Sequence, residues 1–340
     1  MNRNQVLLTG ISGFIAGHVA LQLLDAGFSV RGTVRSLRQA ETIREAMVAA
    51  GADVGRLSFV EADLTADDGW FAAAEGCRFV LHTASPFPAA PSRDRLALMP
   101  AAEGGTMRVI AAAVGAGVER VVLTSSAAAM YSGHPPRADE FYGEADWSDT
   151  DSPTISGYAL SKTLAERAAW KAAQAGGVDL VALNPTLVLG PLSGPALGTS
   201  AALVAAMMRG RMLAVPDLAF ALADVRDVAE AHLAAMTVSA ASGRRFALSS
   251  GTLTLREIGQ AVAKVCPTGS RSLPRWRLPN AVVRVAAMIS PQARAALPEL
   301  GRRKRLDTGP ARDILGLRFR DPEEAIGAMA RSLVSVGAAG

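Results

Sequence analysis

A glycine-rich turn near the N-terminus, between a short apolar run and a helical pattern, constrains the fold of this chain most. Residues 6–9 have the composition of a buried strand, and the turn leads directly into the helical pattern. Gly10 permits a tight turn, Gly13 lets the backbone approach a pyrophosphate, and small Ala16 lets the helix pack closely on a sheet. Free N–H groups at the helix N-terminus then favour an anion. The expected cofactor contacts here are Gly10, Ser12, Gly13, Phe14 and Ile15, and the alternative is an ordinary glycine-rich turn.

Short β-branched runs alternate with longer helical patterns through the first half of the chain. This alternation is typical of β–α–β units and a parallel sheet. The predicted strands are 6–9, 29–34, 57–61, 79–82, 120–124 and 179–183, and helices are predicted to begin near Gly13, Leu37, Gly69, Arg95 and Gly157. The fold class is therefore α/β, a Rossmann-type doubly wound parallel sheet, with its ligand crevice at the carboxyl ends of the strands.

The second half of the chain has a different pattern, because prolines punctuate it from Pro191 to Pro322. We expect residues 1–190 to form an NADP-binding Rossmann domain and residues 191–340 to form mostly a smaller, interleaved substrate-binding lobe. Within that lobe, residues 224–240 read as a capped helix that returns to the main sheet.

The end of the second predicted strand indicates which nicotinamide cofactor binds. Enzymes that use NAD usually place an acidic side chain there, whereas this chain has Arg35. An arginine fork can pair with a 2′-phosphate, so NADP(H) is predicted, with Arg38 as a second candidate for the same contact. The alternative is that Arg35 only caps an exposed strand end. After the third and fourth strands, Asp63 and Leu64 are expected at the adenine, and Thr83, Ala84 and Ser85 at the nicotinamide ribose.

Tyr158 and Lys162 stand four residues apart at the start of a predicted helix, so both side chains lie on one face. A nearby ammonium stabilises a phenolate, so Lys162 is expected to lower the pKa of Tyr158 and to hold the ribose hydroxyls while Tyr158 donates a proton. Thr124, at the end of the fifth strand, is expected to contact the cofactor, and it precedes two serines. We choose Ser126 as the group that orients a substrate carbonyl and Ser125 as a structural hydroxyl, with the reverse assignment left open.

Several classes of protein are excluded by composition and spacing. No apolar run is long enough to span a membrane, and Cys77 and Cys266 indicate neither a disulfide nor a zinc site, so we expect a cytoplasmic protein without a metal. The four histidines form no metal motif, although His134, in a proline-rich loop, is a candidate substrate contact. The net charge of +4 is modest, and the basic run 302–305 reads as a solvated loop rather than a nucleic-acid site. No G-x-S-x-G elbow indicates a hydrolase.

Taken together, these segments resemble the extended short-chain dehydrogenases, and within them the dihydroflavonol 4-reductase-like reductases. The resemblance covers nearly the whole chain and is carried by residues 8–16, 33–35, 83–86, 123–127, 158–162 and 183–191. It implies that Ser126, Tyr158 and Lys162 are catalytic, that Arg35 selects NADP, and that Pro185, Thr186, Leu187 and Val188 close over the nicotinamide. It also places residues 146–148 near the substrate and makes 224–232 the returning helix. An extra glycine in the segment 103–106 departs from the family spacing, and 267–306 is the least similar region.

The resulting hypothesis is NADPH-dependent reduction of a ketone or aldehyde, hydrophobic or aromatic, by a monomer or homodimer. One rival is an NAD(P)-dependent sugar-nucleotide epimerase or dehydratase, or a hydroxysteroid-type dehydrogenase, since these share the turn and the Tyr-Lys pair. A second rival is a non-catalytic NADP-sensing regulator on the same fold. The carbonyl compound itself and the stereochemistry of the alcohol are not specified by the sequence.

Overall fold

A computed structural model of the protein describes residues 4–86, 94–137, 139–194, 198–210, 212, 214–265 and 276–338. Cys266 and the segment 267–275 lie outside these described residues. Among the residues described, no helix is long and apolar enough to cross a membrane, and no cluster of histidine, cysteine and acidic side chains could hold a metal ion. Cys77 is a buried free thiol.

A parallel sheet of seven strands forms the centre of the molecule, in the order β11-β7-β5-β4-β1-β2-β3. The strands are β1 (Gln5–Thr9), β2 (Ser29–Val34), β3 (Leu57–Glu61), β4 (Phe79–His82), β5 (Arg120–Thr124), β7 (Asp179–Pro185) and β11 (Arg245–Leu248). The strand order reverses between β1 and β4, which is where such a sheet opens its ligand crevice. The predicted α/β fold is therefore confirmed. All six predicted strands are present, and β11 was not predicted.

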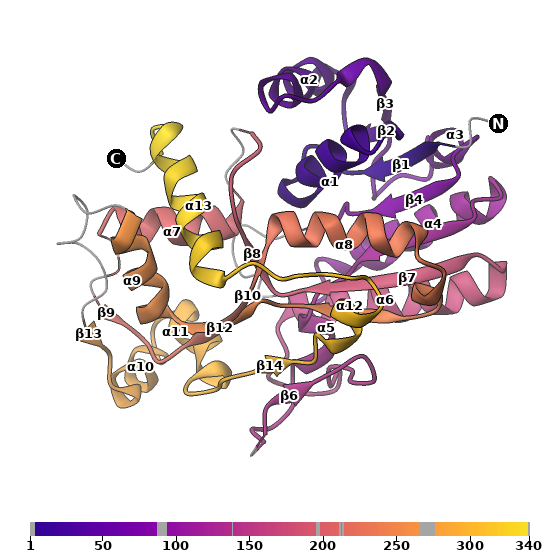
Figure 1. Ribbon diagram of the computed structural model, residues 1–340. Coiled ribbons are helices and arrows are strands. Elements are labelled where there is room, and N and C mark those ends of the chain that lie inside the picture. Colours follow the sequence, from indigo (N-terminus) through magenta and orange to yellow (C-terminus); the bar gives the residue numbers. More distant parts are fainter. Residues whose placement is uncertain are drawn as a thin grey trace.

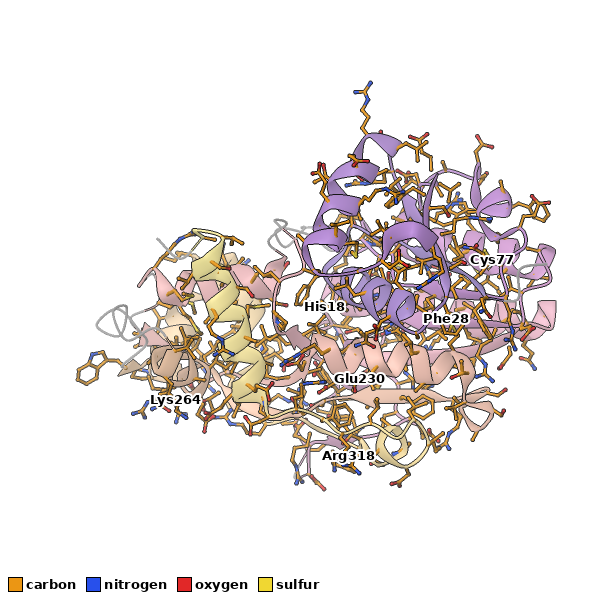
Figure 2. The ribbon with its side chains drawn as sticks, turned by 45° about the horizontal axis from the view of Figure 1, so that its top comes forward. His18, Phe28, Cys77, Glu230, Lys264 and Arg318 are labelled. Atoms are coloured by element: carbon orange, nitrogen blue, oxygen red, sulfur yellow. The ribbon has the colours of Figure 1, made fainter. Side chains whose placement is uncertain are left out.

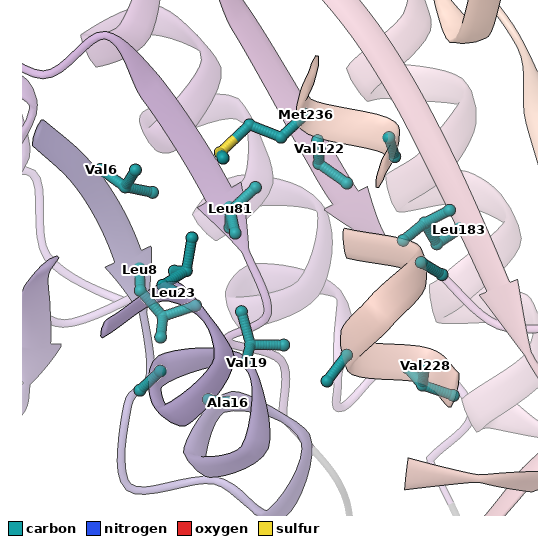
Figure 3. Close-up of a cluster of buried hydrophobic side chains, with 14 of the residues drawn as sticks. Val6, Leu8, Ala16, Val19, Leu23, Leu81, Val122, Leu183, Val228 and Met236 are labelled. Carbon is teal, nitrogen blue, oxygen red and sulfur yellow. The ribbon is translucent and has the colours of Figure 1, made fainter. Parts of the chain in front are cut away.

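Two layers of helices cover the sheet. One face carries α1 (Phe14–Asp25) and α8 (Val225–Thr237), and the other carries α3 (Trp70–Ala74), α4 (Gly105–Gly115) and α6 (Gly157–Gly176). Figure 3 shows Val19 of α1 and Val228 of α8 over the same face of the sheet, in one hydrophobic cluster with Leu81. The segment 225–237 thus packs on the main sheet beside α1. Its apolar side chains face the sheet and are buried there.

The long helix on the second face begins later than predicted. Residues 95–98 form a turn, a π-helical turn η3 (Pro100–Gly104) follows, and regular α-helix begins only at Gly105, so the predicted start at Arg95 is wrong. A π-turn holds one residue more than an α-turn, which agrees with the extra glycine expected in this segment. A Cβ atom at Gly105 would lie 2.8 Å from the Leu64 side chain. The glycine therefore lets α4 approach the loop after β3.

The second lobe is built around a three-stranded sheet, β12-β10-β8, with helices packed on it (Figure 1). Its main elements are β8 (Leu187–Leu189), α7 (Thr199–Met208), β10 (Ala219–Asp224), β12 (Gly251–Thr254), α9 (Leu255–Val265) and α13 (Pro322–Ser335). The smaller elements are η1 (Leu37–Gln39), α2 (Ala40–Ala49), η2 (Val54–Arg56), α5 (Ala128–Tyr131), β6 (Phe141–Tyr142), β9 (Ala214–Val215), η4 (Ser239–Ala241), β13 (Trp276–Arg277), α10 (Asn280–Ala286), α11 (Pro291–Ala296), η6 (Leu297–Glu299), β14 (Arg305–Leu306) and α12 (Gly309–Asp313).

Contacts made by α1 and α8, the two helices on one face of the central sheet, tie the second lobe to that sheet. His18, which Figure 2 shows on α1, donates through Nε2 to the carbonyl of Pro191 at 2.8 Å. On the neighbouring helix, Arg226 of α8 forms ion pairs with Asp224, the N-cap of α8, and with Glu324 of α13. These contacts fix the lobe against the face of the sheet that carries α1 and α8.

The basic run 302–305 is a set of ion pairs that holds this lobe together. Its pairs are Arg302–Glu140, Arg303–Asp217, Lys304–Glu299 and Arg305–Asp139. Arg302 and Lys304 are buried, so the expectation of a solvated loop is wrong for these two side chains. Each of these four charges is paired with a carboxylate.

Candidate active site

The glycine turn after β1 forms a cradle at the N-terminus of α1. Gly10 has φ +67°, and a Cβ atom there would lie 3.0 Å from Ala84, so both turn conformation and space require glycine. The helix cap at Gly13 makes no side-chain hydrogen bond, and the first backbone N–H groups of α1, at Phe14 and Ile15, have no intrahelical partner. This cradle therefore fits a pyrophosphate.

Several of the other predicted cofactor residues line the same crevice. Thr83 and Ser85, after β4, line the cavity described below, and Thr83 Oγ1 donates to the Thr9 carbonyl at 2.5 Å. Ser12 and Arg38 line another cavity, of about 320 Å³. Gly13 and Phe14 line both this cavity and the larger one described below.

Arg35 and the residues expected at the adenine lie outside both cavities. The Arg35 side chain is exposed, and its charge helps to lower the pKa of Asp63, although hydrogen bonds from Thr65 lower that pKa more. Leu64 packs against α4. The predicted roles of Arg35, Asp63 and Leu64 stay predictions.

Ser126, Tyr158 and Lys162 meet in one wall of the crevice. Ser156 caps α6 by accepting from the Ala159 N–H at 3.1 Å, which starts the helix so that Tyr158 and Lys162 share a face. Tyr158 and Ser126 share a side-chain hydrogen bond, and the Lys162 Nζ donates to the Thr124 carbonyl at 3.0 Å. A carbonyl oxygen placed between the Ser126 and Tyr158 hydroxyls could accept hydrogen bonds from both.

Burial shifts the pKa values of this group. Desolvation raises the pKa of Tyr158, although the hydrogen bond to Ser126 opposes the shift. The net direction is opposite to the expected lowering by Lys162, because burial outweighs the other influences. Desolvation also lowers the pKa of Lys162 to about 8, while the Glu166 carboxylate raises it. At neutral pH the phenol is thus protonated and able to act as an acid.

The two serines after β5 have different surroundings. Both serines line the cavity, but the buried Ser125 hydroxyl donates to Glu166 Oε2, whereas Ser126 Oγ accepts from the Ala128 N–H at 3.1 Å and shares a hydrogen bond with Tyr158. Ser125 is therefore held as a structural group, which supports the choice of Ser126.

Glu166 is a site residue that sequence reasoning missed. It is fully buried on α6, one turn after Lys162, and accepts from Asn184 Nδ2 at 2.8 Å and from Arg245 Nε at 2.5 Å. Arg245, in β11, also lies 3.7 Å from the centre of the Trp147 ring. The only signal in the sequence was the four-residue spacing from Lys162, which places Glu166 on the same helix face.

Two buried histidines, His82 and His232, form hydrogen bonds with threonines at the ends of central strands, Thr9 of β1 and Thr124 of β5. His232 Nδ1 donates to the Val228 carbonyl at 2.7 Å, so its Nε2 accepts from the Thr124 hydroxyl, also at 2.7 Å. Burial lowers the pKa of His82 to about 3 and that of His232 to about 4, so both are neutral. The Thr124 hydroxyl consequently faces the interior, and its carbonyl is the group directed to Lys162.

A cavity of about 900 Å³ runs from the glycine turn past the three predicted catalytic residues into the second lobe. Its lining includes all four residues of the segment 185–188. His134 and residues 146–148 are not among the residues that line it. The Ser148 hydroxyl instead donates to the Ala128 carbonyl at 2.6 Å, and so supports the cavity wall from behind.

Comparison with known proteins agrees with this geometry. The family described as "NAD dependent epimerase/dehydratase family" matches residues 6–248. Cinnamoyl-CoA reductase CAD2 of Medicago truncatula is 38% identical over 71% of this chain and 74% of its own length. Ketoreductase azaE of Aspergillus niger is 32% identical over 97% of both chains. Yeast methylglyoxal/isovaleraldehyde reductase Gre2, solved with NADPH, has a TM-score of 0.80 at 27% identity, covering 98% of this chain and 99% of its own.

Proposed function

The chain belongs to the NAD dependent epimerase/dehydratase family, the extended short-chain dehydrogenases, and on this basis we propose that it reduces the carbonyl group of a ketone or aldehyde with NADPH. The observation that carries the proposal is the meeting of Ser126, Tyr158 and Lys162 in the wall of a cavity that begins at the glycine turn. The two relatives compared above, which match most of the chain, are named as reductases, and this favours carbonyl reduction over epimerisation.

The described residues fit a dinucleotide. The pyrophosphate would lie on the N-terminus of α1, against the N–H groups of Phe14 and Ile15, with Gly10 and Gly13 leaving room for it. When bound, NADPH supplies the hydride. Pro185 to Val188 would cover the nicotinamide, and Arg35, with Arg38 beside it on the next turn, would hold the 2′-phosphate.

The chain's own residues would then supply orientation and the proton. The Ser126 hydroxyl donates a hydrogen bond to the substrate oxygen and orients the carbonyl. Tyr158, kept protonated by burial, donates its proton to that oxygen as negative charge develops on it. Lys162 holds the ribose hydroxyls, and its charge stabilises the phenolate that remains on Tyr158.

The substrate end of the cavity supports a hydrophobic substrate. Leu218, Phe220 and Ala221 line it from β10 and the turn before it, and Ala295 and Ala296 line it from α11. Such a mostly apolar wall with a few polar groups suits a small carbonyl compound. A monomer or homodimer and a cytoplasmic location stay predictions.

The test follows NADPH absorbance while the purified protein is mixed with aldehydes, aryl ketones and 2-oxo esters. We expect turnover with at least one class, and a Tyr158→Phe variant should lose about 10²-fold to 10⁴-fold in kcat while binding NADPH as the unchanged protein does. Cofactor binding without turnover of any carbonyl would contradict the proposal and favour a regulator. Tightly bound NAD in the purified protein would favour the epimerase alternative.

A further inference from the structure

One charged pair interrupts the otherwise apolar substrate end of the cavity. Glu299, at the end of η6, and Lys304, just before β14, both line the cavity, as does Tyr131 at the end of α5. The three come from separate segments of the chain. Lys304 and Glu299 belong to the region 267–306, where the chain is least similar to its family.

Short hydrogen bonds and a contact with an aromatic ring fix the position of the Lys304 ammonium. Lys304 Nζ donates to both oxygens of Glu299, at 2.8 and 2.6 Å, and lies 4.5 Å from the centre of the Tyr131 ring. The Lys304 side chain is only 8% exposed, whereas that of Glu299 is 45% exposed. Lys304 is therefore the fixed partner, and Glu299 has oxygen surface to offer to a ligand.

Tyr131 adds an uncommitted donor. Its hydroxyl forms no hydrogen bond with any residue that the structure describes. Burial raises its pKa, and the negative charge of Glu299 raises it further, so the group stays a neutral donor. The phenol thus lies within electrostatic reach of both the ion pair and the proposed proton donor.

The pair is not explained by stability. Burial removes water from the Lys304 ammonium, whereas Glu299 is partly exposed and screened by solvent, so we expect the pair to add little stability compared with apolar side chains of similar volume. An apolar pair would also continue the lining formed by Ala295, Ala296 and Phe220. A role in binding the substrate explains why two charged side chains line this part of the cavity.

We propose that Glu299, Lys304 and Tyr131 recognise a hydroxyl group on the substrate, away from the carbonyl that is reduced. This inference rests on the proposed function. A hydroxyl can donate to a Glu299 oxygen and accept from the Tyr131 hydroxyl, which uses both free positions. A carboxylate on the substrate would be repelled by Glu299, and an ammonium group by Lys304, since each charge of the pair is already matched.

The test compares benzylacetone with its para-hydroxyl and para-carboxyl derivatives, together with the same three forms of benzaldehyde and cinnamaldehyde to vary the length. We expect kcat/KM to be about tenfold to a hundredfold higher for the hydroxyl form than for the unsubstituted form in at least one length series, because a hydrogen bond to a charged group is made only there. The carboxyl form should be the poorest. Equal values for the hydroxyl and unsubstituted forms at every length, or a preference for the carboxyl form, would overturn the inference.

Variants of the three residues test whether they cause the preference for the hydroxyl form. The double change Glu299→Gln with Lys304→Met removes both charges and leaves no buried unpaired ammonium, and it should bring the ratio of hydroxyl to unsubstituted kcat/KM to within about threefold of one. Tyr131→Phe should lower the same ratio. Arg305→Gln breaks the neighbouring exposed pair with Asp139, and it should leave the ratio unchanged.

Two further results separate the possible failures. An undiminished ratio in the double variant would show that recognition lies elsewhere in the cavity. If no carbonyl compound is turned over at all, the proposed function itself fails, which is a different result from turnover without preference.

Discussion

Arg245 and Glu166 form an ion pair of 2.5 Å that is closed off from solvent at the base of the site. The pair joins β11 to α6 and stands one helical turn from Lys162. Its carboxylate also receives the Ser125 hydroxyl and the Asn184 amide. The Glu166 side chain therefore connects the helix of the proposed proton donor to β7, to β11 and to the residue that follows β5.

Removing this carboxylate should destabilise the fold strongly. Glu166→Gln leaves Arg245 as an uncompensated buried charge, and we expect the free energy of unfolding to fall by about 3–5 kcal/mol. Urea denaturation measures the change. Glu323→Gln is the matched control, because its pair with Lys264 is exposed and should contribute less than about 1 kcal/mol. Similar losses for the two variants would contradict the central position given to Glu166.

Activity should fall above about pH 8 because Lys162 loses its proton there. Burial lowers the pKa of this lysine to about 8, so it is charged below that pH and neutral above it, whereas burial moves the pKa of Tyr158 upward. A profile of kcat/KM from about pH 6 to about pH 10 should show this decline first. Lys162→Arg keeps its charge throughout this range and should remove the decline near pH 8, at a lower rate. A profile that is flat to about pH 10 in the unchanged protein would contradict this role of Lys162.

Arg35 should decide between the two nicotinamide cofactors. Arg35→Ser removes the permanent charge proposed to pair with the 2′-phosphate, and we expect the KM for NADPH to rise about tenfold or more while the KM for NADH changes little. Steady-state kinetics with both cofactors measures this ratio. Arg78→Ser is the control, because that exposed arginine pairs with Glu119 just before β4, at the end of the strand remote from the crevice. If the ratio does not move, the contact belongs to Arg38, and Arg38→Ser should then shift it.

The two glycines at the start of α4 should tolerate alanine very differently. A Cβ atom at Gly105 would lie 2.8 Å from the packed Leu64 side chain, whereas one at Gly104 would meet only the flexible end of Arg108, at 3.0 Å. We expect Gly105→Ala to lower the free energy of unfolding by about 1–3 kcal/mol. Gly104→Ala should be neutral or stabilising by up to about 1 kcal/mol. Thermal or urea denaturation of both variants checks the order, and the reverse order would contradict the packing described at Leu64.

The sequence was sufficient to predict those features of the fold and the site that depend on residues close together in the chain. Buried β-branched runs placed six parallel strands, and the four-residue spacing of Tyr158 and Lys162 placed them on one helix face. These features depend on neighbours in the chain, which is why pattern and structure agree.

Features that depend on distant partners were not predictable. The strand β11 begins with Arg245, whose charge argues against a buried strand until Glu166, 79 residues away, is seen to neutralise it. In the same way Arg302 looked solvated because its carboxylate partner, Glu140, is separated from it by 162 residues. A charge can be buried only where its partner is also present, and the linear order of residues does not show that partner.

The segment from Pro185 to Val188 passes directly from one sheet to the other. β7 ends the central sheet at Pro185 and β8 opens the sheet of the second lobe at Leu187, with Thr186 between them donating its N–H to the Leu248 carbonyl at 3.1 Å. The chain also crosses between the two sheets from β10 into α8 and from β11 into β12. A rotation of one sheet against the other would therefore displace Thr186 together with these crossings, so opening of the substrate lobe would also move the segment proposed to cover the nicotinamide.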